Sequence, residues 1–588
     1  MPNVLLVYPK FPPSYWGAQF ALEFVGKKSC MPPLGLLTVA GMFPQDYRLK
    51  VVDMNVNALA DDDLRWADLV FTSTMIVQKD SLRDVIGRCN RARVPIVVGG
   101  PHPTSFSDEI EGVDHFVLDE VEDIFPGFLQ DLRDGTAKRV YRAPDRPDIT
   151  KTPLPRYDLI NLQDYGAMAL QFSRGCPFDC EFCDITKLFG RVPRTKTNAQ
   201  ILSEFDLLYR LGWRGHLFLV DDNFIGNKRD AMRLLPAVAQ WQKERNYPFY
   251  LFTEASVNLA GLDALMDAMV EAGFRMTFLG IETPNPEALV TTKKKQNTKK
   301  GEENYLLHAV QKIQQKGMQV MGGFIVGLDG DREDAFDAQI QFIQDAGIPL
   351  AMVGLLSALK GTDLYNRLQR EGRLLEESTG NNVTITLNFE TQMDRQTLIN
   401  GYKRVLTTIY DPGLRNYFER CLTMLKHLGP TQSLNSGIGK KEWAAFVTSM
   451  KRQLFSKQGP AYLRFLLRVL KDNPRMFSEA VRLAIWGYHF EKITSQQIAV
   501  DDFKQYLESE FDAFKETISR MAASEYQRIT EIPKFARELF DRVHAKYDHI
   551  HEDFRYSLRD ALEGFKRSVN SQLEELFSPF SMEVKSTD

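Results

Sequence analysis

The 588-residue sequence has few cysteines and no long apolar run. Six cysteines occur, and Cys30, Cys89 and Cys421 are scattered singly, a usage that indicates a reducing compartment rather than a disulfide framework. No stretch reaches the ~18 uninterrupted apolar residues of a membrane span, and the apolar run that follows Met1 is too short for a secretory signal. The sequence therefore predicts a cytoplasmic protein and leaves a peripheral membrane association open.

An excess of charge of one sign is also absent. Lys and Arg number 73 and Asp and Glu number 77, for a formal net charge of −4, which predicts no general affinity for nucleic acid. A hydrophobic content of 44% and a charged content of 26% are typical of a globular enzyme. Because the chain is too long for one compact core, we expect about three domains.

The sequence also lacks a fourth cysteine near Cys176, Cys180 and Cys183, which form a triplet. The run CPFDCEFC has C-x3-C-x2-C spacing, whereas zinc favours C-x2-C pairs completed by a second Cys or His pair. Cysteine thiolates are the usual ligands of iron–sulfur clusters. A cubane held by three of them keeps one iron open for another ligand.

From residue 1 to about 145, strand and helix patterns alternate. Strands are expected at 3–8, 48–53, 68–72, 96–100 and 115–118, and helices at 34–42 and 81–91. This alternation predicts a doubly wound parallel sheet whose ligands bind at the carboxyl ends of the strands. YPKFPP, not G-x-G-x-x-G, follows the first strand, which argues against NAD or FAD.

A proline-rich linker at 146–164 separates this domain from a second alternating region at 165–375. Its strands are expected at 168–172, 216–220, 250–254, 276–281, 320–326 and 352–356. Six such units suit an open partial barrel, with chemistry at the carboxyl ends of the strands. The cysteine loop follows the first strand, and Asp222, Glu254 and Glu282 lie at or near the ends of the next three. The fifth strand carries a glycine motif that includes Gly323. Each carboxylate has a structural alternative, a helix N-cap for Asp222 and a buried ion pair for the two glutamates.

Beyond residue 376 the sheet patterns stop. Amphipathic helices are expected at 395–410, 461–471, 476–490 and 500–521, so residues 376–588 form an all-α region. PAYLRFLLRVLKDNPRMFSEAVRLAIWGYHF mixes basic, aromatic and aliphatic residues. It could cap an apolar substrate, touch a membrane surface, or pack on the barrel or on other helices.

The cysteine triplet, with Phe182 before its last cysteine, resembles the radical S-adenosylmethionine (radical SAM) superfamily. The resemblance implies a [4Fe-4S] cluster whose open iron is chelated by S-adenosylmethionine. By position, it assigns the methionine amine to Asp222, the ribose to Glu254 and Glu282, and the adenine to Gly323 and Phe182.

The order YPKFPP, MPPLGLLTVAG, VVDMNV, VVGGPHPT is similar to the cobalamin-binding domain that precedes the barrel in one radical SAM class. The fold class implied is α/β, with a Rossmann-like cobalamin-binding domain, a radical SAM partial (β/α)6 barrel and the helical region. The expected cobalamin contacts are Asp53, Asn55, Ser73, Thr74, Met75, Gln78, Gly99, Gly100 and Glu120. A D-x-H-x-x-G signature would place its cobalt-ligating histidine at position 55, where asparagine stands. Either cobalamin binds without a histidine from this loop, or the domain has lost the cofactor.

The resemblance implies a methyltransferase that uses a 5′-deoxyadenosyl radical and methylcobalamin on an unactivated carbon. We expect a hydrophobic substrate, a hopanoid-like lipid or a bacteriochlorophyll-precursor-like tetrapyrrole, and an electron donor such as flavodoxin or ferredoxin. Two alternatives stay open: a radical SAM cyclase or rearrangement enzyme without net methyl transfer, and a non-catalytic cobalamin or iron–sulfur sensor. The catalytic residues, the substrate and the oligomeric state are not predicted.

Overall fold

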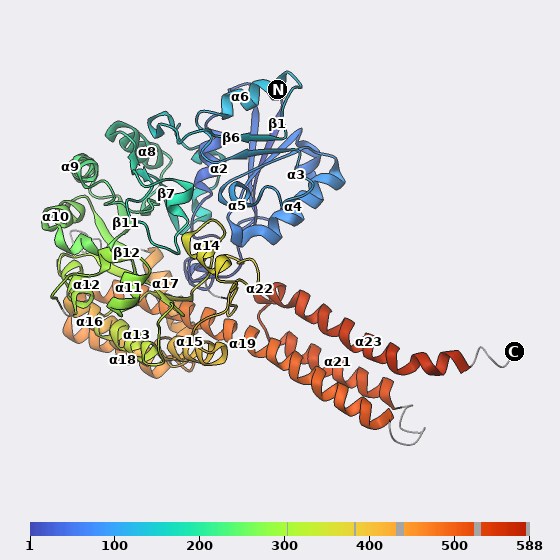
Figure 1. The fold of residues 1–588 in the computed structure, drawn as a ribbon. Coiled ribbons are helices and arrows are strands. Elements are labelled where there is room, and N and C mark those ends of the chain that lie inside the picture. The colour runs from blue at the N-terminus through green and yellow to red at the C-terminus, as the bar shows by residue number, and fades with distance from the viewer. Residues whose placement is uncertain (303, 382–383, 431–439, 523–530, 584–588) are drawn as a thin grey trace. The chain divides into compact units, whose positions relative to one another are not determined.

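A computed structural model describes residues 1–302, 304–381, 384–430, 440–522 and 531–583 (Figure 1). The chain divides into two compact units, Met1–Glu491 and Lys492–Asp588. The first unit contains both expected sheets. No helix among the described residues is long and apolar enough to cross a membrane.

The N-terminal domain is a six-stranded parallel sheet in the order β2-β1-β3-β4-β5-β6. Its strands are β1 (Asn3–Tyr8), β2 (Arg48–Asp53), β3 (Leu69–Ser73), β4 (Ile96–Gly99), β5 (His115–Leu118) and β6 (Val140–Arg142). Its helices are α1 (Gln19–Leu22), α2 (Leu34–Ala40), α3 (Asp61–Trp66), α4 (Lys79–Ala92), α5 (Pro101–Phe106) and α6 (Phe125–Arg133). Separate apolar clusters cover its two faces, one with Leu5 and α4, the other with Val4, α2 and α6. The doubly wound prediction is confirmed, and the strand order reverses direction between β1 and β3, where such sheets bind ligands.

The central domain is a second parallel sheet in the order β14-β13-β12-β11-β10-β7, so sequential strands are neighbours, as in a partial barrel. Its strands are β7 (Ala167–Leu170), β10 (Gly215–Leu219), β11 (Phe249–Ala255), β12 (Phe274–Glu282), β13 (Gln319–Val326) and β14 (Ala351–Leu355). A small antiparallel pair, β8 (Ser173–Arg174) and β9 (Arg194–Thr195), flanks the cysteine loop.

Helices connect the barrel strands and continue beyond them. The connecting helices are α7 (Ile185–Leu188), α8 (Asn198–Arg210), α9 (Lys228–Glu244), α10 (Asp263–Glu271), α11 (Pro286–Thr291), α12 (Tyr305–Gln315) and α13 (Asp334–Asp345), and α14 (Asp363–Arg370) follows the last strand. The later helices are α15 (Arg395–Ile409), α16 (Arg415–His427), α17 (Lys440–Gln453), α18 (Gly459–Asp472), α19 (Phe477–Ala522), α21 (Ile532–Asp548), α22 (Glu552–Arg555) and α23 (Arg559–Glu583). The two helices expected at 476–490 and 500–521 are one continuous helix, α19.

The first of the later helices pack on the barrel. The Tyr402 hydroxyl on α15 donates to the Val353 carbonyl at 3.1 Å, and the Tyr410 hydroxyl donates to the Ala351 carbonyl at 2.8 Å. The Arg420 side chain on α16, which is 1% exposed, donates to the Ile348 and Pro349 carbonyls. Helices α15 and α16 therefore pack on the barrel. The segment at 460–490 packs on both the barrel and other helices: Phe465 of α18 stacks on Phe418 of α16, and Gln319 Nε2 on β13 donates to Glu479 of α19.

The second unit is helical and has a core of its own. Phe503 contacts Tyr547, Phe514 stacks on Phe535 with ring centroids 5.8 Å apart, and Arg542 pairs with Glu510 at 2.9 Å. These contacts join the second part of α19 to α21.

Candidate functional site

The cysteine loop runs from the end of β8 into α7, and a tight turn fixes its start. Gly175 has φ +99°, and a Cβ there would lie 2.9 Å from the Gly190 carbonyl oxygen, so only glycine fits without strain. The Cys176 amide donates to that same carbonyl at 3.1 Å, and the Cys183 amide donates to the Cys180 carbonyl at 3.2 Å. The backbone therefore holds the loop in one conformation without any disulfide.

The three thiols are free and half-buried, as cluster ligands need to be. Side-chain amides reach two of them: Asn223 Nδ2 lies 3.8 Å from Cys176 Sγ, and Gln296 Nε2 lies 3.4 Å from Cys180 Sγ. In the described part of the chain, no three His, Cys, Asp or Glu side chains are grouped to hold a single metal ion. Three free thiols on a fixed loop, with amide donors beside the sulfurs, fit an iron–sulfur cluster.

Asp221 and Asp222 follow β10 and accept hydrogen bonds from different parts of the segment around the cysteine loop. Asp221 accepts hydrogen bonds from the Phe172 and Ser173 amides at 2.8 and 3.0 Å and from the Ser173 hydroxyl, and burial raises its pKa to about 7. It ties β10 to the segment before the cysteines. Asp222 is half-buried and accepts from the Gly175 amide at 2.8 Å, and burial raises its pKa to about 6.

Glu254, near the end of β11, has a half-buried carboxylate with no hydrogen bond or ion pair among the described residues. Burial, and then the negative charges of Asp222 and Asp221, raise its pKa to about 8. A positively charged ligand beside Glu254 and Asp222 would favour the ionised form of both carboxyl groups.

Glu282, at the end of β12, already has a cation. Its carboxylate pairs with Lys294 Nζ at 2.6 Å, and both side chains are about one-tenth exposed. Burial alone would lower the pKa of Lys294. The Glu282 carboxylate and the nearby thiols of Cys180 and Cys183 outweigh burial, so the pKa of Lys294 lies above its ordinary value. The ion-pair alternative for Glu282 is thus present in the structure, and its ribose role stays a prediction.

Gly323 on β13 lies opposite Gly280 on β12 in the strand register. A Cβ at Gly323 would lie 2.7 Å from Cζ of Phe278. At Gly280 a Cβ would meet Glu282 and Lys294, so the two glycines let these neighbouring side chains pack closely on the sheet. The adenine role of Gly323 stays a prediction. Phe182 packs against the apolar cluster of Leu328 and Leu356, beyond the ends of β13 and β14.

An aromatic row crosses the sheet face that carries Glu254. Phe218 and Phe252 stack face to face with ring centroids 4.5 Å apart, and Phe278 follows on the next strand. Trp16, from the N-terminal domain, lies against Phe278 at 5.1 Å and Phe218 at 6.5 Å. We call these four side chains the aromatic wall. Sequence analysis missed it, although alternate aromatic residues on neighbouring strands were a usable signal.

The cobalamin prediction falls on the carboxyl edge of the first sheet. Gly100 has φ +98°, and a Cβ there would lie 2.7 Å from Ser73 Oγ and 2.8 Å from the Thr74 amide. Thr72 Oγ1, Thr74 Oγ1 and His102 Nδ1 are buried and have no hydrogen-bond partner in the described structure. Buried polar atoms normally have partners, so these atoms and the glycine turn fit a polar ligand at this edge.

Other predicted cobalamin residues are engaged within the protein. Asp53 accepts from the Tyr165 hydroxyl at 3.0 Å, Asn55 Oδ1 accepts from the Phe11 amide at 2.8 Å, and Gln78 Nε2 donates to the Pro9 carbonyl at 2.6 Å. These bonds shape the loop after β1. The Met75 side chain is 49% exposed beside them and is open to contact a ligand. The contacts of these four residues with cobalamin stay predictions.

Glu120 joins the two sheets. Its carboxylate, 5% exposed, pairs with Arg174 at 2.8 Å and with Arg194 at 2.6 Å, both from the central domain. Glu122 pairs with the same Arg174 at 2.8 Å. Since Glu120 follows β5 and Arg174 precedes the cysteine loop, the carboxyl edge of the first sheet meets the cluster-bearing end of the second. The resemblance to the cobalamin-binding radical SAM class implies this juxtaposition.

Comparisons with known proteins agree with this arrangement. Residues 27–129 match the B12 binding domain, residues 170–343 match the radical SAM superfamily, and residues 362–501 match a domain of unknown function. An uncharacterized methyltransferase of Synechocystis sp. is 42% identical over 530 residues, covering 88% of this chain and 97% of that protein. The hopanoid C-2 methylase of Rhodopseudomonas palustris is 37% identical, covering 64% and 71%.

Among solved structures, the radical S-adenosylmethionine methyltransferase TsrM from Kitasatospora setae, with cobalamin and a [4Fe-4S] cluster bound, has the same fold. The TM-score is 0.51 at 15% identity, over 82% of this chain and 98% of TsrM. The two sheets in this order, the three free thiols and the matched relatives give one conclusion: the chain belongs to the cobalamin-dependent radical SAM methyltransferases, enzymes that use a [4Fe-4S] cluster, S-adenosylmethionine and cobalamin.

Proposed function

We propose that this enzyme methylates an unactivated carbon of a hydrophobic substrate, either a hopanoid-like lipid or a bacteriochlorophyll-precursor-like tetrapyrrole. The observation that carries the substrate class is the aromatic wall, because rigid apolar molecules bind to surfaces lined by aromatic side chains with few polar groups. The similarity to a hopanoid C-2 methylase, and at 26% identity to a bacteriochlorophyllide d C-12(1)-methyltransferase of Chlorobaculum tepidum, supports the same class.

Different side chains bind the cluster and S-adenosylmethionine. When bound, the cluster, S-adenosylmethionine and cobalamin supply a 5′-deoxyadenosyl radical and a transferable methyl group. Cys176, Cys180 and Cys183 hold the cluster. Asp222 receives the positively charged amine of S-adenosylmethionine, which favours the ionised carboxylate, and Glu254 forms hydrogen bonds with the ribose hydroxyls.

The remaining contacts complete both cofactor sites. Glu282, paired with Lys294, accepts a hydrogen bond from the ribose, while Phe182 and the backbone at Gly323 contact the adenine. The Gly99–Gly100 turn and the Ser73 and Thr74 hydroxyls would hold cobalamin at the carboxyl edge of the first sheet. A flavodoxin or ferredoxin supplies the electron.

The test is anaerobic reconstitution with iron, sulfide and cobalamin, followed by S-adenosylmethionine, a reductant and either a hopanoid or a bacteriochlorophyllide. We expect 5′-deoxyadenosine together with a product one carbon heavier than its substrate. A product without the added carbon would instead establish the cyclase or rearrangement alternative. Phe252→Ala should weaken substrate binding while leaving 5′-deoxyadenosine formation measurable. If Phe252→Ala turned over both substrates like the wild type, the aromatic wall would not be the substrate surface.

A further inference from the structure

The proposed reaction gives no role to a basic surface on α17 and α18. Residues 443–471 contain no Asp or Glu, in a chain whose net charge is −4. The same stretch contains six basic residues: Lys451, Arg452, Lys457, Arg464, Arg468 and Lys471. Such a segment carries a local positive charge in a chain that is slightly acidic overall.

The inner face of α18 is already packed. Tyr462, Phe465 and Val469 are at most 3% exposed, and Phe465 stacks on Phe418 of α16 with ring centroids 4.7 Å apart. The leucines on the outer face are not needed for that packing. Leu463, Leu467 and Leu470 are 42%, 56% and 45% exposed.

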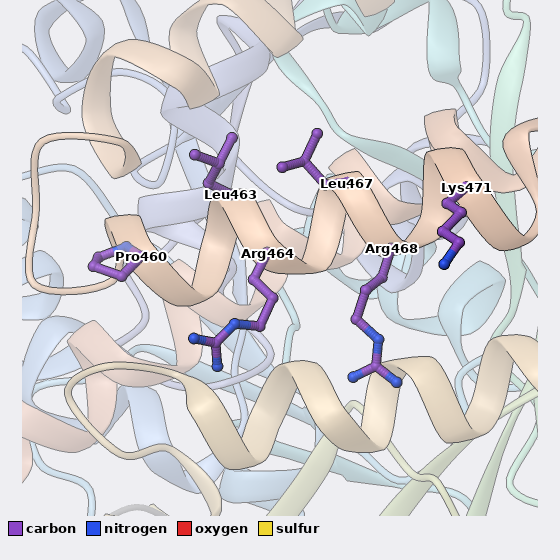
Figure 2. Close-up of a pocket in the computed structure, with 6 residues that line it drawn as sticks. All are labelled: Pro460, Leu463, Arg464, Leu467, Arg468 and Lys471. Atoms are coloured by element: carbon purple, nitrogen blue, oxygen red, sulfur yellow. The ribbon is translucent and has the colours of Figure 1, made fainter.

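The outer face is an amphipathic strip. At about 100° per residue, Leu463, Leu467 and Leu470 fall within an arc of roughly 60°. Figure 2 shows Leu463 and Leu467 projecting from one side of the helix and Arg464 and Arg468 from the other. The apolar strip is thus bordered by guanidinium groups along its length.

The turn between α17 and α18 extends this surface. Phe455 is 88% exposed, the largest exposed fraction of any described large hydrophobic side chain, and Lys457 follows it. Arg468 pairs with Glu419 at 3.0 Å, and Arg452 pairs with Glu23. Lys451, Lys457, Arg464 and Lys471 have no ion pair in the described part of the chain and are free to meet an outside anion.

We propose that α18 and the α17–α18 turn dock on the surface of an anionic lipid bilayer. Leu463, Leu467 and Phe455 enter the boundary between headgroups and acyl chains, and Arg464 and Lys471 contact lipid phosphates. An in-plane amphipathic helix with leucine and phenylalanine on one side and basic residues on the other has this behaviour. The docking does not depend on the identity of the substrate.

Charge decides against a second copy of this chain on the same surface. A symmetric pairing through α18 would bring Arg464 and Lys471, which have no ion pair among the described residues, close to the same two residues of the other copy. A uniformly anionic surface is the complementary partner.

The experiment measures sedimentation of the full-length, cluster-reconstituted protein with vesicles. The protein should co-sediment with vesicles of equimolar phosphatidylcholine and phosphatidylglycerol, and only weakly with vesicles of phosphatidylcholine alone. Added salt should dissociate it from the anionic vesicles. The double variant Leu463→Glu and Leu467→Glu should lose sedimentation. Arg464→Glu with Lys471→Glu should lower the partition constant by tenfold or more, at ~1 kcal/mol per basic residue near an anionic surface.

Matched controls lie on α9, where Met232 is 39% exposed and Lys243 is exposed. Met232→Glu and Lys243→Glu should sediment like the wild type. Unchanged far-ultraviolet circular dichroism and iron content show that each variant is folded.

The proposal is overturned if the wild type fails to sediment with the anionic vesicles at low salt, or if the α9 variants weaken sedimentation as much as the α18 variants. It is also overturned if the leucine variants sediment normally but convert a dimer to a monomer in light scattering. Since no turnover is measured, these results are separate from any failure of the proposed methyl transfer.

Discussion

Replacing Glu120 by alanine tests whether buried ion pairs hold the two sheets together. The Glu120 carboxylate is the only acidic partner of Arg194 among the described residues, at 2.6 Å, whereas Arg174 keeps Glu122 at 2.8 Å. Removing one member of a buried ion pair costs about 3–5 kcal/mol. Arg194 would keep the Pro147 and Phe189 carbonyls as acceptors, so we expect the free energy of unfolding to fall by about 3 kcal/mol, the lower end of this range.

The measurement is urea unfolding of the reconstituted protein by circular dichroism, with cobalamin retention followed by its absorbance. The control is Glu109→Ala, which removes an ion pair to Lys360 between the same two domains. Both side chains of that pair are well exposed, at 47% and 30%, so the loss should stay below ~1 kcal/mol.

A second variant separates the ion pair from the side chain itself. Combining Glu120→Ala with Arg194→Met removes the uncompensated guanidinium, so it should recover part of the lost stability. If Glu120→Ala unfolds like the wild type but loses cobalamin, the carboxylate contacts the cofactor, and the ion-pair reasoning is refuted.

Three further predictions concern single residues. Glu254 has a pKa of about 8 against the ordinary 4.5, so the folded protein holds an extra proton between those values. The stability of the ligand-free protein should therefore fall as pH rises through that window, and Glu254→Gln should flatten the pH dependence of the urea midpoint. Gly100→Ala should lower the free energy of unfolding by about 1–3 kcal/mol, measured by thermal unfolding. The control is Gly135→Ala, at φ +69° with nothing within 4 Å of the added Cβ, which should lower it by less. Equal losses would show that the Ser73 contact is not the cause. Cys180→Ala should abolish stable cluster binding and S-adenosylmethionine cleavage, read as iron content and 5′-deoxyadenosine, whereas Cys30→Ala should retain both.

The strands were the predictable part of the fold. β1 and β5 begin and end at the expected residues, because buried parallel strands form short apolar runs bounded by turn residues. β6 was missed since its three residues lie at the sheet edge, where Val140 is 47% exposed and no buried pattern forms. In α19, a polar stretch near residues 491–499 weakened the helical period and led to two expected helices where there is one.

For the candidate site, the sequence could predict only which carboxylates lie near one another, because parallel strands place their carboxyl ends at one edge of the sheet. Which of them are neutralised depends on distant residues that local sequence does not specify. Glu120 meets Arg174, 54 positions away, and Glu282 meets Lys294 after an intervening helix. Asp222 and Glu254 have no ion pair among the described residues, and their pKa values rise accordingly. These two unneutralised carboxylates beside the cysteine loop are therefore the ones left for a cationic ligand, a distinction that strand-end position alone could not make.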